Sequence, residues 1–197
     1  MAEAETQTQQ ATSRTVDGVE LPAVGTYAID KSHTQLGFMV RHMAVSKVRG
    51  RFTEFEGTIV VAEDPTQSTV NLTIDANSVD TRDENRDNHL RTNDFFDIAN
   101  HPTWTYVTTS VVADGPGAWK VTGDLTIRGI TKPVVLEATI EGVVQDPYGN
   151  HRVGFSATGE LNREDFDVSF NGVMEAGGVV ISKKVVLEIE AEAVLQA

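Results

Sequence analysis

Apolar and polar residues alternate with a period of two along most of the chain. In residues 69–76, Val70, Leu72 and Ile74 share one parity, and polar residues occupy the other. The same pattern recurs in 119–128, 134–141, 152–161 and 185–193. This period is typical of β-strands that have one buried and one solvated face.

Less regular strands are predicted over 36–43, 50–62 and 103–112, with a shorter one over 167–175. The parity changes between Phe52 and Phe55, which predicts a β-bulge. The dipeptide Asn171-Gly172 favours a tight hairpin in the short strand. Eight or nine antiparallel strands with short turns indicate a sandwich or a barrel, and the length of the strands favours a closed barrel because closure removes exposed edges.

One short helix interrupts the strands. Thr81 and Glu84 have the spacing of a capping box, and Asp87 and Arg91 are spaced to pair across one helical turn. The sequence therefore predicts a helix near 82–91. Residues 1–24 are rich in polar residues and lack periodicity, so we expect a disordered tail followed by one domain over 25–197.

Composition excludes several classes of protein. The chain has 197 residues, no cysteine and a net charge of −13, so disulfides and cysteine-based zinc sites are excluded and nucleic acid would be repelled. No apolar run reaches the roughly 20 residues that span a bilayer. The start lacks the features of a signal peptide, so we expect a cytoplasmic protein without a transmembrane segment.

Candidate catalytic chemistry is sparse. The five histidines are dispersed, and neither a metalloprotease motif nor a serine-hydrolase elbow occurs. His42 shares its parity with Phe38 and Val40, so its side chain projects from the apolar face. It is either a hydrogen-bonded core histidine or a polar contact at the mouth of a cavity. We expect no metal site and no catalytic activity.

The interior predicted by the alternation is apolar. A barrel of about eight strands is either filled by side chains or holds one ligand. Because every regular strand keeps its charges off the inner face, a cavity here would favour a lipophilic ligand. Periodicity does not decide between a filled core and a cavity.

A series of sequence blocks spread over residues 26–195 carries a family resemblance. The blocks are 27–34 (YAIDKSHT), 38–42 (FMVRH), 50–57 (GRFTEFEG), 78–81 (SVDT), 86–90 (RDNHL), 94–97 (DFFD), 101–102 (HP), 123–133 (GDLTIRGITKP) and 162–166 (NREDF). In this order they resemble the YceI-like family of polyisoprenoid-binding, lipocalin-like proteins. The chain departs from the family pattern at Thr34, at Asp167 and at 182–184 (SKK).

The resemblance implies an extended eight-stranded antiparallel barrel, lipocalin-like, with a long apolar channel. It implies non-catalytic binding, carriage or storage of an isoprenoid lipid of the polyprenyl or quinone type. Alternatives are a broad scavenger of lipophilic molecules, an enzyme that uses His42 or His33 as a base on an isoprenoid, and a structural domain with a filled core. We expect no cofactor besides the bound lipid, and a homodimer stays open.

Parity and motif position predict the residues that contact the ligand. His42 is the expected head-group contact, with Arg163 behind it. The full set is Phe38, Val40, His42, Phe52, Phe55, Leu72, Ile74, Phe95, Phe96, Trp104, Tyr106, Leu136, Phe155, Arg163 and Phe170.

Overall fold

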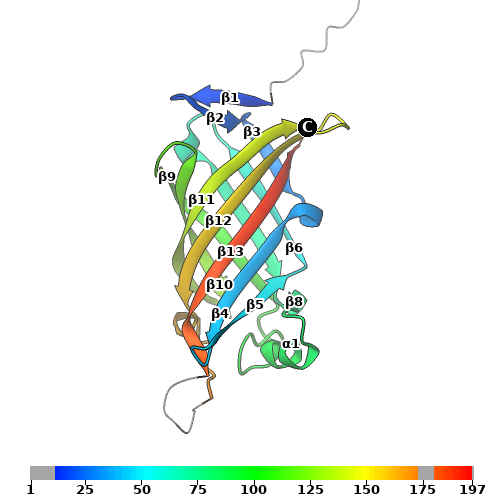
Figure 1. The fold of residues 1–197 in the computed structure, drawn as a ribbon, viewed down its shortest axis with the longest axis vertical. Helices are drawn as coiled ribbons and strands as arrows, with labels where there is room; N and C mark the ends of the chain where they lie inside the picture. The colour runs from blue at the N-terminus through cyan, green and yellow to red at the C-terminus, as the bar shows by residue number, and fades with distance from the viewer. Residues whose placement is uncertain (1–11, 173–179, 197) are drawn as a thin grey trace, which may run out of the picture.

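The computed structural model describes residues 12–172 and 180–196, and its strands close into a barrel (Figure 1). The wall consists of β3 (Gly25–Ile29), β4 (Gln35–His42), β5 (Ser46–Phe52), β6 (Phe55–Val61), β7 (Thr69–Asp75), β9 (Thr103–Ala113), β10 (Ala118–Ile127), β11 (Ile130–Gln145), β12 (His151–Asn162) and β13 (Ile181–Leu195). Neighbours pair antiparallel in the order β12-β11-β10-β9-β7-β6-β3-β13, and β12 also pairs with β13. This closed ring of eight confirms the predicted all-β barrel.

The wall continues at one end beyond this ring. β13 pairs with β3 near its own C-terminal end and with β4 over its earlier part, while β5 pairs with β4 and with β8 (Val79–Asp80). The prediction of one bulged strand over 50–62 is wrong, because β5 and β6 are separate strands. They part where the backbone N–H of Thr53 bonds to Ser78, which follows β7 in the 3₁₀ turn η3 (Ala76–Ser78).

The predicted helix is present as α1 (Glu84–Arg91), but its capping differs from the prediction. Asp83, not Thr81, is the N-cap, and its carboxylate accepts the Arg86 N–H. Asp87 does not pair with Arg91. It is buried and accepts hydrogen bonds from the backbone and hydroxyl of Thr81. None of the helices in the described parts of the chain has the length and apolarity to cross a bilayer.

A hairpin precedes the barrel in the chain. β1 (Ser13–Val16) and β2 (Val19–Pro22) form their own two-stranded sheet, which lies across the end of the barrel opposite to α1 (Figure 1). The expectation of a disordered tail over 1–24 is therefore wrong for 13–22, because Leu21 is buried there at 3% exposure. Residues 1–11 lie outside the described part.

The predicted strand over 167–175 is absent from its described part, 167–172. The 3₁₀ turn η4 (Arg163–Phe166) leads into this segment. The side-chain amide of Asn171 bonds to both the N–H and the carbonyl of Ile181, so it takes the place of a backbone ladder. Residues 173–175 lie outside the described part. Two further 3₁₀ turns are η1 (Lys31–His33) and η2 (Pro65–Gln67).

Candidate ligand-binding channel

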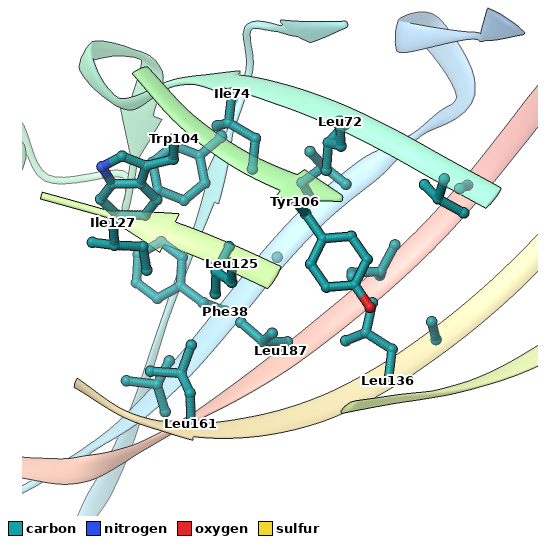
Figure 2. Close-up of a pocket in the computed structure, with 18 of the residues that line it drawn as sticks. Phe38, Leu72, Ile74, Trp104, Tyr106, Leu125, Ile127, Leu136, Leu161 and Leu187 are labelled. Carbon is teal, nitrogen blue, oxygen red and sulfur yellow. The ribbon is translucent and has the colours of Figure 1, made fainter. Parts of the chain in front are cut away.

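The barrel encloses a cavity of about 820 Å³ that extends between its two ends. Its wall is formed by inward-facing side chains, among them Leu72, Tyr106, Leu125 and Leu187, which point toward one another in Figure 2. Charged and histidine side chains enter the lining only at the ends, where they are Arg14, His42, Asp83, Arg86, His89 and Arg163. The alternation in the sequence thus produces an apolar channel.

Tyr106 of β9 is the largest polar side chain in the middle of the channel. Its ring lies directly over Gly123, where an added Cβ would come within 2.4 Å of the ring. Its hydroxyl donates to the carbonyl of Val121 at 2.9 Å. Burial raises the pKa of Tyr106 above its ordinary value, so the hydroxyl stays protonated. The hydroxyl is thus already hydrogen-bonded within the barrel wall.

A cluster of aromatic side chains forms the wall toward the α1 end. Phe52 lies 4.9 Å from Trp104, and Phe96 lies 4.7 Å from Trp104, both edge to face between ring centroids. Phe38 lies 5.7 Å from Phe52 and packs over Gly50, which leaves no room for a Cβ. These edge-to-face contacts fix the shape of the wall where the channel approaches its mouth.

The mouth lies at the α1 end. Exposed residues of this end contribute to the lining, namely Asp83, Asn85, His89 and Phe170. The segment before α1 is held by Arg86, whose guanidinium donates to the hydroxyl and the carbonyl of Thr81 at 2.7 and 2.8 Å. His42, at the end of β4, lines the same region.

Arg163 has a structural role that was not predicted from the sequence. It is 5% exposed, and its guanidinium donates to the carbonyls of Val168, Phe170 and Ser182. Burial lowers its pKa from the ordinary value. These bonds tie the 167–171 segment to the start of β13, so Arg163 is a bracing residue at the rim, and its contact with a head group stays a prediction.

The opposite end is covered by the β1–β2 hairpin. Leu21 and Pro22 of β2 line the cavity and are buried. Arg14 of β1 fastens the hairpin to the barrel, because its guanidinium donates to the carbonyls of Ala62 and Glu63 beside β6. We call this the closed end.

One group of side chains outside the channel could attract a metal ion. Ligand atoms of Asp30, His33 and Glu192 lie within 4.8 Å of one another. However, Arg152 donates to both of these carboxylates and to Asp146, so a guanidinium already occupies the carboxylate oxygen atoms that a metal ion would need. The cluster carries no metal assignment.

Fourteen of the fifteen residues expected to contact a ligand line the cavity. The exception is Phe55, which lies buried in the core without reaching the lining. That these fourteen residues bind a ligand stays a prediction. The set missed other lining residues of the same inner faces, including Leu125, Ile127, Leu161, Leu187 and Ile189. Their parity in the alternating strands was the signal that could have found them.

Buried donors without a partner are concentrated along this channel. Four buried side-chain N or O atoms in the described part have no hydrogen-bond partner, and three belong to lining residues: Arg14 Nε, Trp104 Nε1 and Trp119 Nε1. A buried donor without a partner is destabilising. These nitrogen atoms are buried within the wall, so the surface that the middle of the channel presents to a ligand is apolar.

This fold and this channel define a β-barrel of the kind that binds one lipophilic ligand inside its wall. Comparison with known proteins assigns the family. The YceI-like domain matches residues 27–193, and the chain therefore belongs to the YceI-like family.

Relatives and solved structures agree with this assignment. Protein YceI of Escherichia coli is 43% identical over 145 residues, which cover 72% of this chain and 75% of that protein. The crystal structure of a YceI protein of Campylobacter jejuni matches with a TM-score of 0.69 and 32% identity, over 85% of this chain and 96% of that one. A polyisoprenoid binding domain from Saccharophagus degradans matches with a TM-score of 0.65 and 18% identity, over 88% and 100% of the respective chains, and shows the shared fold.

Proposed function

We propose that this protein binds a long isoprenoid lipid, of the polyprenyl or quinone type, in the barrel channel and carries or stores it without chemical change. The observation that carries the proposal is the continuous cavity of about 820 Å³, whose charged lining residues are confined to its ends. The polyisoprenoid binding of the Saccharophagus domain, which shares the fold, supports the same ligand class.

The size of the channel suits such a ligand. A cavity of about 150 Å³ holds one benzene molecule, or about 25 Å³ per carbon atom. The channel would then hold about 30 carbon atoms, which is about six isoprene units. Each buried methylene contributes about 0.8 kcal/mol, so chain length alone supplies strong binding.

A second candidate is a scavenger of varied lipophilic molecules. It is favoured by the middle of the channel, where the hydroxyl of Tyr106 is already bonded to Val121 and selects no polar group. Chain-length selectivity separates the two candidates. A carrier prefers a narrow range of lengths, whereas a scavenger accepts many unrelated ligands.

Native mass spectrometry of the purified protein, with an organic extract analysed in parallel, tests the proposal. We expect a stoichiometric adduct, or uptake of one polyprenyl alcohol per chain on titration. A protein that takes up no polyprenyl lipid at any length would refute the proposal. Tight binding of unrelated apolar molecules with no dependence on length would favour the scavenger.

Substitution of Val40 by Asp gives a matched test of the lining. Val40 lines the channel, so an aspartate there places a charge against the apolar chain, and we expect lipid retention to be lost while the barrel stays folded. The control is Val112→Asp, at an exposed position of β9, which should bind as the unmodified protein does. Lipid retained in Val40→Asp would show that the chain does not pass this residue.

A further inference from the structure

The turn between β4 and β5 holds apolar side chains in the solvent. Met43 and Ala44 have φ angles of 49° and 57°, and the N–H of Val45 bonds to the carbonyl of His42 at 3.0 Å. The N–H of Met43 also donates to the carbonyl of Val180 at 2.8 Å, so the turn is fixed from two sides. The result is a tip where Val45 is 83% exposed and Met43 is 41% exposed.

Cations flank this tip. Arg41 and Lys47 are direct partners in the β4–β5 ladder, and their parity, opposite to that of His42 and Val40, directs them to the outside of the barrel. The neighbouring ion pairs join Arg49 to Glu188 and Lys183 to Glu164. Across residues 12–172 and 180–196, no carboxylate lies within ion-pair distance of Arg41 or Lys47.

Two lysines of the adjacent strand are paired with carboxylates, Lys183 with Glu164 and Lys184 with Glu160. The register of β13 against β4 is irregular between Ile181 and Val185, and Lys183 and Lys184 occupy this stretch beside Arg41. The rest of the chain is acidic, with a net charge of −13. An anionic surface would therefore repel most of the protein and attract Arg41 and Lys47, which orients the molecule.

The tip also lies at the mouth of the channel. His42, the residue before Met43, lines the cavity, as does Phe170, which is 40% exposed. Figure 1 shows the β4–β5 turn at the end of the barrel that carries α1, away from the β1–β2 hairpin. A surface that bound the tip would thus face the mouth of the channel.

We propose that the 41–47 turn docks the mouth of the barrel onto an anionic lipid bilayer. Met43 and Val45 enter the boundary between head groups and acyl chains, and Arg41 and Lys47 lie among the lipid phosphates. The inference rests on the proposed function, because docking gives an apolar chain a path from bilayer to channel without passage through water. It adds a partner of defined chemistry, a negatively charged membrane surface.

Vesicle cosedimentation tests the proposal on the full-length protein. The probes are vesicles of phosphatidylcholine with phosphatidylglycerol and vesicles of phosphatidylcholine alone. We expect binding to the anionic vesicles only, weakened by salt, and reduced about tenfold in Val45→Asp because burial of one valine is lost. Charge reversal in Lys47→Glu should reduce it similarly. Val144→Asp, at an exposed valine of β11, which ends at the opposite end of the barrel, is the matched control and should bind normally.

Uptake of a polyprenyl alcohol from detergent micelles separates docking from lipid binding. Val45→Asp should load from micelles as the unmodified protein does, which also shows that it is folded, yet load more slowly from vesicles. Equal binding to neutral vesicles, or unchanged binding in both variants, would overturn the docking proposal. A change of mass in sedimentation equilibrium caused by Val45→Asp, without a change in vesicle binding, would assign the tip to a second copy of the chain and overturn it as well. Failure to load from micelles would instead count against the proposed function.

Discussion

Substitution of Ala191 by Phe should shorten the channel from its closed end. Ala191 of β13 lines the cavity, and it pairs with Phe155 two residues before the stretch of β13 that meets β3. The added ring has the size of benzene, which fills a cavity of about 150 Å³. It therefore removes roughly a fifth of the 820 Å³ channel.

The expected loss of affinity follows from the displaced part of the ligand. The ring takes the place of about six ligand carbons, each worth about 0.8 kcal/mol, so a chain that fills the channel loses at most about 5 kcal/mol. That corresponds to an increase in Kd of at most roughly 4,000-fold. A chain too short to reach Ala191 should lose nothing.

The assay is a competition titration with a graded series of polyprenyl alcohols. Val112→Phe adds the same ring to the outside of β9 and should leave every Kd unchanged. If Ala191→Phe weakens short and long chains equally, the ring distorts the barrel in general. If it weakens neither, the ligand does not extend to the closed end, and the assignment of the channel is refuted.

Three further predictions concern single side chains. Tyr106→Phe loses the hydrogen bond to Val121, so we expect a loss of about 1 kcal/mol in the free energy of unfolding and a Tm lower by about 2–4 °C, with lipid binding kept. Gly123→Ala forces the Tyr106 ring away from the wall, so it should cost about 1–3 kcal/mol of stability in a urea titration and weaken lipid binding. Hydrogen bonds from Arg152 and Asn150 hold the pKa of Asp146 well below its ordinary value, so this carboxylate stabilises the fold above the unfolded pKa of about 4 and the effect fades as the pH falls below it. Tm measured from neutral to acid pH should therefore drop less steeply in Arg152→Gln, and an unchanged slope would contradict this assignment.

The strands were predictable because a strand with one buried and one solvated face alternates apolar and polar residues. Leu125 and Ile127 are buried, while Asp124, which precedes Leu125, is exposed, and the parity of the sequence shows this directly. Whether the interior is filled or open was not predictable. A filled core and a channel require the same alternation, and the difference depends on how side-chain volumes from distant strands add up.

The β1–β2 hairpin at the closed end was not predicted, although its turn sequence is typical of a hairpin. Asp17-Gly18 is a strong hairpin dipeptide, and both residues have the positive φ angles, 51° and 82°, that a tight turn of this kind needs. The polar composition around it outweighed this signal in the prediction of a tail. What stabilises the hairpin is tertiary, because Leu21 is buried against the barrel and Arg14 bonds to carbonyls 48 and 49 residues away in the chain.

The roles of the buried charged residues depend on contacts that sequence spacing does not show. Asp87 has the spacing of a surface ion pair with Arg91, yet it is buried against Thr81. Arg91 instead donates to the carbonyls of Asn77 and Val79. A buried charged group needs hydrogen-bond partners within the protein, and the fold determines which partners lie close enough.

Three side chains that line the channel carry a buried nitrogen donor without a hydrogen-bond partner. In a barrel whose core is simply packed, buried polar atoms find partners, and those that do not cost about 1–3 kcal/mol each. Here Trp104 Nε1 lies in the aromatic wall, and Trp119 Nε1 and Arg14 Nε lie toward the closed end, all in residues that line the cavity. These nitrogen atoms are buried within the wall, so a ligand in the channel covers the apolar surface of their side chains without reaching the donors. Such a ligand binds the folded state alone, so by mass action it stabilises the barrel as well as occupying it.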